Sequence, residues 1–138
     1  MDRDEMLAKE EMSWRAFADV IEAMPIDRRT EEGVVPGWST HDIVWHCAYW
    51  TNDGAMALER SNAGDRSDVP EEPEADIVAR GRTMTWEELL AKAKESRERI
   101  RTALSACPEI DDWVVEAFAG ETYEHYDEHT AEVRAFLS

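Results

Sequence analysis

Four stretches of this sequence carry apolar residues at the spacing of an α-helix, and none shows the strict alternation that is typical of a β-strand. The first covers residues 3–24 and ends at Pro25, because proline has no amide hydrogen and disfavours helix in the residue before it. The other three are expected at residues 40–60, 85–106 and 120–137. Because each helix must bury its apolar face, the sequence predicts an all-α fold, a four-helix bundle.

The connection between the second and third predicted helices, residues 61–84, is unusually long and is rich in Asp, Glu, Pro and Gly. About 20 extended residues reach the whole length of a bundle, at about 3.3 Å per residue. The segment can therefore cross over between two parallel helices, or it can wander as a loop over one flank. The piece that joins the third and fourth helices holds Trp113 and Phe118 and is expected to be non-helical.

The length and the charge of the chain limit what it can be. With 138 residues it is long enough for one domain with a proper core and too short for two ordinary domains, so residues 1–138 are predicted to form a single domain. The formal net charge is -17, from 15 basic and 32 acidic residues. Such a surface repels phosphate backbones and anionic lipids, which argues against nucleic acid and membranes as partners.

No part of the sequence has the pattern of a membrane-spanning or secretory segment. Its apolar runs fall well short of about 18 consecutive residues, and the charged N-terminal stretch lacks the apolar core of a signal peptide. Cys47 and Cys107 lie within or at the end of helical patterns instead of forming a disulfide framework, which suits a reducing compartment. A cytoplasmic location is therefore expected.

The stretch GWSTHDIVWHCAYW, residues 37–50, predicts the start of the second helix and puts a histidine on its apolar face. Ser39 is the expected N-cap, and Asp42, three residues later, can complete a capping box. His46 lies on the apolar face of this helix, whereas His41 lies about 140° away, at a first turn that is expected to be exposed. His46 is therefore the candidate functional residue of this stretch.

The last predicted helix carries two histidines on its apolar face. His125 and His129 are four residues apart, so their side chains emerge about 40° apart, and Val133 continues the same stripe. Burying these imidazoles and His46 without polar partners would cost about 1–3 kcal/mol each. Two interpretations fit: the three are hydrogen-bonded core residues, or they share a divalent metal ion and leave one coordination position open, as in catalytic zinc sites.

Two carboxylates could support such a site or act as a base. Asp53 follows His46 by seven residues and returns to nearly the same face, and Glu121 precedes His125 by four residues. For both, a solvated helix position is the competing interpretation. Cys47 points about 100° away from His46 and is expected to pack in the core. Trp38, Trp45 and Trp50 are expected to line a pocket beside the metal. For Trp45 the alternative is that it faces a partner subunit.

The residues 37–50 and the stretch ETYEHYDEHTAEVRAFL, residues 121–137, resemble the two histidine-bearing motifs of the DinB-like family, also called the DinB and mycothiol-dependent maleylpyruvate isomerase superfamily. The resemblance implies a four-helix bundle with a long connection between helices two and three, and frequent homodimers. It also implies a divalent metal on the set that matches His46, His125 and His129. Characterised members of the family include isomerases and transferases that depend on mycothiol, bacillithiol or glutathione, and others resemble self-protection hydrolases that often lack the histidines.

Two hypotheses of function follow. The first is a metal-dependent thiol S-transferase or isomerase that acts on a small molecule, with zinc or nickel and a low-molecular-weight thiol as cofactors and a homodimer as its assembly. The second is a non-catalytic bundle that binds a small molecule or serves in stress response or self-protection, in which the histidines are structural. The direction of the helices stays open, because His46 would meet His125 and His129 most easily between parallel helices, whereas the family implies an up-down-down-up order.

Overall fold

The computed structural model describes residues 1–138 and contains helices and no β-strand. This confirms the predicted all-α fold. None of the helices combines the length and the apolar character needed to cross a membrane. In chain order the elements are α1 (Arg3–Glu22), the short 3-10 helix η1 (Ile26–Arg28), α2 (Thr40–Asn62), α3 (Glu74–Gly81), α4 (Trp86–Ser105), α5 (Asp112–Glu121) and α6 (Tyr123–Leu137).

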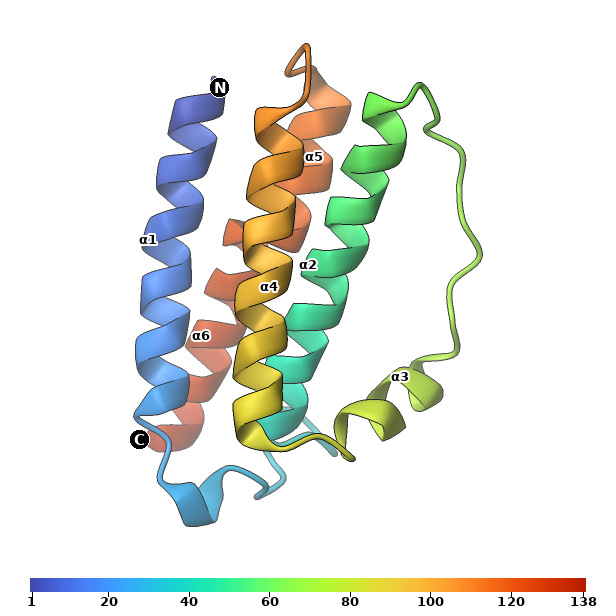
Figure 1. Ribbon diagram of the computed structural model, residues 1–138. Coiled ribbons are helices and arrows are strands. Elements are labelled where there is room, and N and C mark those ends of the chain that lie inside the picture. The colour runs from blue at the N-terminus through green and yellow to red at the C-terminus, as the bar shows by residue number, and fades with distance from the viewer.

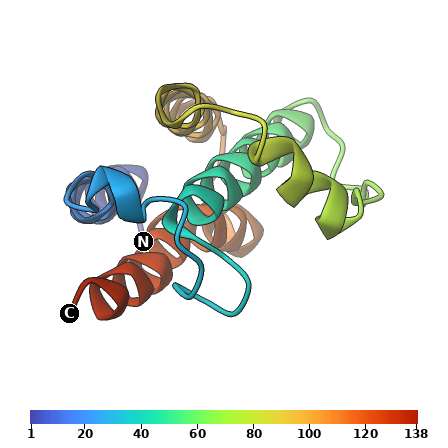
Figure 2. The same cartoon turned by 90° about the horizontal axis from the view of Figure 1, so that it is seen from below.

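The helices form a bundle in which α2 and α4 run parallel (Figure 1). In that view α1 descends, α2 and α4 ascend, and α5 followed by α6 descends as the fourth column. Seen from below, α2 lies between α4 and α6, with α3 outside the bundle (Figure 2); α2 packs against α3, α4, α5 and α6. The long connection is therefore a crossover, and α6 runs antiparallel to α2.

The helix starts follow the capping pattern of the sequence. The Ser39 side chain accepts from the backbone N–H of Asp42, and the Asp42 carboxylate accepts from the backbone N–H of Ser39, which is the predicted capping box. Thr85 caps α4 and Asp111 caps α5 in the same way, each through its side-chain oxygen and the backbone N–H three residues on. These caps satisfy amides that would otherwise lack partners in the first turn.

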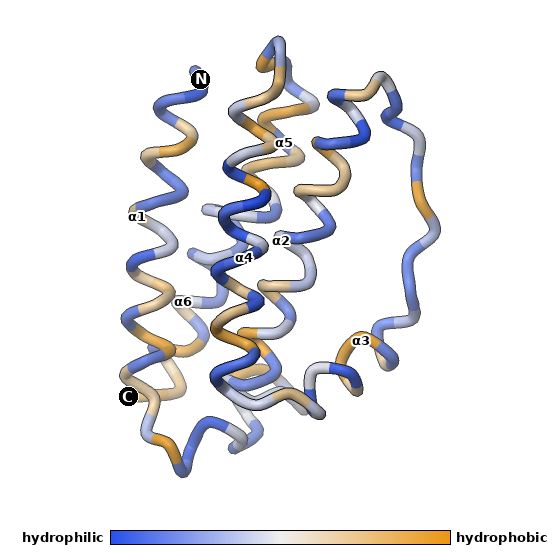
Figure 3. The backbone as a smooth tube through the Cα atoms, in the orientation of Figure 1, coloured by the Kyte–Doolittle hydropathy of each residue, from blue (hydrophilic) through white to orange (hydrophobic).

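The crossover carries a helix that the sequence pattern missed. Residues 65–73 are mostly hydrophilic and exposed (Figure 3), and α3 follows them. Trp45 fixes α3 to the bundle, since its indole Nε1 donates to the Ile77 carbonyl at 2.7 Å. A Cβ at Gly81 would lie only 2.2 Å from the Trp45 ring, so glycine permits this contact. Trp45 is thus covered by α3 of its own chain, at the position where a partner subunit was the alternative.

Two predictions about the C-terminal part were wrong. The segment expected to be non-helical contains α5, and the last helix begins at Tyr123 instead of Gly120. Thr122 separates α5 from α6 with non-helical dihedrals, φ -126° and ψ -101°. Its hydroxyl donates to the Phe118 carbonyl at 2.6 Å, which satisfies a carbonyl at the break. The apolar spacing of the sequence continues across Thr122 and so gave no indication of two helices.

The core has two parts, one at each end of the bundle. The part near the C-terminus of α6 contains a stack of Phe17 and Tyr126, with ring centroids 5.6 Å apart, and Trp14 edge-on to Tyr126. The opposite part is aliphatic apart from one phenylalanine and one cysteine; its members are Met6, Ala55, Leu58, Ile100, Ala103, Leu104, Cys107, Val114 and Phe118. The first part joins α2 and α6, since it contains Ile43 and Cys47 of α2 and Tyr126 and Val133 of α6.

Candidate metal centre

The three histidines singled out by the sequence lie together between α2 and α6. Each of His46, His125 and His129 offers one ring nitrogen, and these three nitrogens all lie within 4.8 Å of one another. His125 Nε2 and His46 Nε2 are 2.9 Å apart, and the three pairs of ring centroids are separated by 4.6, 4.8 and 5.0 Å. Imidazole nitrogens at these separations are close enough to bind a single ion.

The antiparallel course of α6 brings the histidines of α2 and α6 to similar heights, counted from the lower ends of the two helices. His46 lies about 9 Å from the lower end of α2, and His129 about 12 Å from the lower end of α6, at 1.5 Å per residue. Since α5 fills the upper part of the fourth column, α6 starts near mid-height and His125 lies in its first turn (Figure 1). The sequence left the helix direction open, with parallel helices as the easier arrangement; in the structure α6 runs antiparallel to α2 (Figure 1).

Trp38 covers one side of the centre. The residues before it form a tight turn in which the Trp38 amide donates to the Val35 carbonyl at 3.0 Å and Gly37 takes a φ of +80°, which favours glycine. Pro36 at the preceding position suits the same turn. The turn holds the Trp38 ring 4.8 Å from the His46 ring. The prediction that Trp38 lines a pocket near His46 agrees with this contact.

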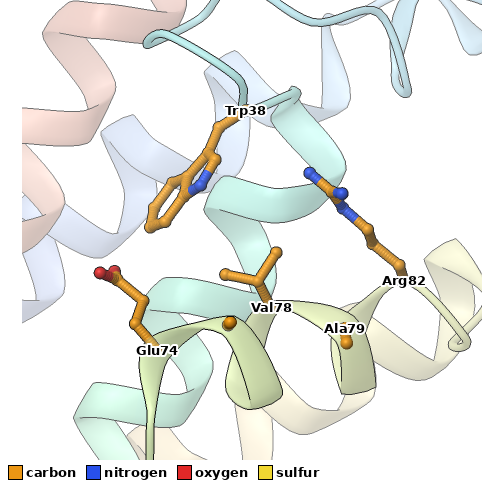
Figure 4. Close-up of a pocket in the computed structure, with 6 residues that line it drawn as sticks. Trp38, Glu74, Val78, Ala79 and Arg82 are labelled. Atoms are coloured by element: carbon orange, nitrogen blue, oxygen red, sulfur yellow. The ribbon is translucent and has the colours of Figure 1, made fainter.

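An open groove of about 570 Å³ lies between Trp38 and α3. Figure 4 shows the Trp38 ring facing Val78 and Ala79 of α3, with Glu74 at one end and Arg82 at the other. Arg82 is already paired, because its guanidinium donates to the Asp42 carboxylate at 3.1 and 3.3 Å. The groove offers aromatic and aliphatic walls, and Trp38 both lines it and contacts the His46 ring.

Burial keeps two of the imidazoles neutral. It lowers the pKa of His46 to about 4, with a smaller contribution from the charge of His129. It lowers the pKa of His125 to about 3, again mainly through desolvation and then through His129 and His46. At neutral pH both rings thus keep an unprotonated nitrogen, which is the form that binds a metal ion.

Glu121 is the candidate carboxylate that the structure buries. Desolvation, reinforced by the charges of Asp53 and Glu71, raises its pKa to about 7. Its Oε2 is buried and has no hydrogen-bond partner. The side chain fits against Gly54, where a Cβ would come within 2.9 Å of the Glu121 Cβ. A carboxyl group with this pKa can both accept and release a proton near neutral pH.

Asp53 is exposed and lies beside the crossover. It is on an exposed face of α2, where it lines two grooves beneath the crossover with Tyr49 and Val69. Desolvation raises the pKa of its carboxyl; Arg60 opposes this shift and Glu71 adds to it. No hydrogen bond or ion pair joins Asp53 to the three histidines. Glu121 also has no hydrogen bond to the histidines, but of the two carboxylates it is the buried one, four residues before His125.

The structure corrects the expectation for His41 and agrees with that for Cys47. His41 is only 9 % exposed, because the loop before α4 covers it and its Nε2 lies 2.9 Å from the Met84 carbonyl oxygen. It takes no part in the histidine group. Cys47 is 1 % exposed and packs in the core, and burial raises the pKa of its thiol well above the usual value. A thiol in this environment is unreactive.

One residue of the site was missed from the sequence. Glu132 is hydrogen-bonded to His129 through Oε1 and Nδ1. The spacing of three residues on one helix is the available indication, because side chains at i and i+3 are neighbours. Acidic residues are so frequent in this chain, 32 of 138, that this spacing alone does not single out Glu132.

Replacing Glu121 with glutamine is expected to stabilise the metal-free protein increasingly as the pH rises. The pKa of Glu121 is raised in the fold, so its contribution to stability is fully present below its unfolded value of 4.5 and is lost as the pH rises through about 7. Glutamine does not ionise. The difference in unfolding free energy between variant and wild type should grow by about 2 kcal/mol from pH 4.5 to about pH 8, allowing for partial solvent screening.

Urea unfolding in the presence of a chelator measures this difference. Glu116→Gln on the exposed face of α5 is the matched control and should give a difference that is flat with pH. A flat difference for Glu121→Gln as well would show that its carboxyl group has an ordinary pKa.

Comparison with known proteins supports the resemblance seen in the two histidine-bearing stretches. No curated protein and no solved structure matches the chain. The sequence model of one family, described as the mycothiol maleylpyruvate isomerase N-terminal domain, matches residues 3–135, which is nearly the whole chain. The chain therefore belongs to the mycothiol maleylpyruvate isomerase N-terminal domain family, within the DinB-like superfamily.

Proposed function

We propose that this protein binds a divalent metal ion through His46, His125 and His129 and uses it in a thiol-dependent isomerisation or transfer reaction on a small molecule. The convergence of three imidazole nitrogens within 4.8 Å carries the proposal. The donor set suits zinc or nickel, since neutral imidazole is a preferred ligand of both. A metal in such a site lowers the pKa of a bound thiol or water, so that the nucleophilic anion forms near neutral pH.

The residues around the histidines have separate tasks in this proposal. Trp38 and the α3 wall of the groove would hold the organic part of the substrate or thiol beside His46, since they offer aromatic and aliphatic surface. Glu121, with a pKa of about 7, would carry a proton to or from the reacting molecule. The family description names mycothiol, which makes this thiol the first to test. The homodimer and the cytoplasmic location stay predictions.

Metal analysis of the protein, purified without an affinity tag and then reconstituted with zinc or nickel, tests the proposal. We expect about one ion per chain, in keeping with a single group of three ligands. A saturating metal should also raise the unfolding free energy by about 2.7 kcal/mol at a hundred times its dissociation constant. If neither zinc nor nickel is retained or stabilises the fold, the site is not a metal centre.

Mycothiol separates the enzyme from a bundle with structural histidines. In a thermal-shift measurement we expect mycothiol to stabilise the metal-loaded protein more than the metal-free protein, because its sulfur would be bound by the ion. The desthio analogue of mycothiol is the matched control and should lose this difference. Equal shifts with both compounds would show that the thiol group plays no part in binding.

A further inference from the structure

His129 differs from the other two histidines in having a carboxylate partner. Its Nδ1 is hydrogen-bonded to Glu132 Oε1, and the His129 side chain is only 7 % exposed, compared with 29 % for Glu132. A carboxylate can only accept a hydrogen bond, so the proton of neutral His129 must be on Nδ1. The lone pair of the ring is then on Nε2, the remaining nitrogen.

We infer that Glu132 is a positioning residue of the metal centre, which fixes the tautomer and the ring orientation of His129 so that Nε2 is the ligand atom. This inference rests on the proposed function. A carboxylate on the far nitrogen of a ligand histidine orients the ring and makes the other nitrogen a better donor. Both effects strengthen binding of a cation at Nε2.

The other histidines lack this support. His125 Nδ1 is buried and has no hydrogen-bond partner, and the hydrogen bond of His46 is to His125 itself, between their Nε2 atoms. In that contact one Nε2 must donate and the other accept, so one ring has to change tautomer before both can bind a metal ion through Nε2. His129 is therefore the one ligand whose tautomer is fixed by a carboxylate before the ion arrives.

The position of Glu132 argues for this role over a purely structural one. Glu132 follows His129 by three residues on α6, so the helix itself holds the pair together. An ion pair between exposed side chains at this spacing contributes little to stability. Here the histidine is buried, and the centroid of its ring lies 5.0 and 4.6 Å from those of His46 and His125. Three neutral imidazole ligands would leave the charge of a bound cation uncompensated. The negative charge of Glu132, next to this site, would offset part of it.

The first test concerns the metal-free protein and is independent of metal binding. The ¹⁵N chemical shifts of His129 report which ring nitrogen carries the proton. We expect the Nδ1-protonated form in the wild type and in Glu132→Gln, whose amide oxygen can still accept the hydrogen bond. Glu132→Ala should give a mixture of tautomers, because it offers no acceptor. The control is Glu128→Ala, which removes the same charge from an exposed position on α6.

The second test measures zinc affinity by competition with a chelator. Loss of such a carboxylate partner typically weakens metal binding about 10–100-fold; we expect this loss for Glu132→Ala, a smaller loss for Glu132→Gln and none for Glu128→Ala. Unchanged tautomer and unchanged affinity in Glu132→Ala would overturn the inference. If the wild type binds no zinc, the proposed function fails, while the tautomer measurement still decides whether Glu132 positions His129.

Discussion

Replacing His46 with alanine is expected to weaken zinc binding by more than about 100-fold, the upper end of what loss of an outer carboxylate costs a metal site. His46 is the only ligand candidate on α2, whereas His125 and His129 both lie on α6. Without it, two imidazoles one helical turn apart remain, and the ion loses the connection between the two helices. Competition with a chelator, followed for wild type and variant at one pH, measures the effect.

The fourth histidine of the chain provides the control. His41 lies on the same helix and is buried, but its ring is hydrogen-bonded to the Met84 carbonyl and lies outside the group of three. His41→Gln should therefore bind zinc as the wild type does. If His46→Ala and His41→Gln keep the same zinc affinity, His46 is not a ligand and the proposed centre is wrong.

Replacing Arg97 with methionine is expected to lower the unfolding free energy by about 3 kcal/mol, the cost typical of removing one partner from a buried ion pair. Glu10 on α1 is completely buried, with 0 % of its side chain exposed. Two nitrogens of Arg97 on α4 donate to it at 2.7 and 2.9 Å, and Arg101 donates at 2.6 Å. Methionine fills the space of the arginine but leaves the Glu10 carboxylate with a single charged partner.

The double variant Glu10→Gln, Arg97→Met separates charge from packing. Removing the carboxylate together with the guanidinium should recover most of the lost stability, because the fully buried charge is gone, while Arg101 is 31 % exposed and keeps its hydrogen bond to the Leu7 carbonyl. Urea unfolding of the wild type, the single variant and the double variant gives the comparison. A loss below about 1 kcal/mol for Arg97→Met would show that Arg101 and water satisfy Glu10 on their own.

These two sites illustrate which contacts a helical pattern can predict. The apolar spacing of α4 identifies the face that contains Ala93 and Ile100, but it says nothing of the partner of Arg97, which is 87 residues away. The ion pair between Arg82, at the end of the crossover, and Asp42, in the first turn of α2, is likewise not indicated by the helical pattern. Ion pairs between helices depend on which helices are neighbours. The apolar periodicity within one helix does not tell which helices pack against it.

The histidine centre shows what can and what cannot be predicted about a side chain from the sequence. The angle of a side chain around its helix axis follows from a local geometry of about 100° per residue, and this was enough to predict that His46, His125 and His129 face the interior of the bundle. His41 was assigned to the exposed side by the same argument, and this was wrong, because its exposure depended on the loop before α4 that folds over it. The angle of a side chain around its helix axis does not determine which other segment of the chain covers it.

The sequence by itself determined the all-α class, the start of α2, and the faces of α2 and α6 that carry the three histidines, because caps and helical periodicity are properties of a few consecutive residues. Tertiary structure decided the rest: the break at Thr122, the antiparallel course of α6 against α2, and the heights at which the histidines meet. Height along a bundle depends on where each helix starts relative to its neighbours. That is fixed by packing between residues far apart in the chain, such as Thr51 on α2, whose hydroxyl donates to the Glu121 carbonyl at 2.7 Å where α5 ends.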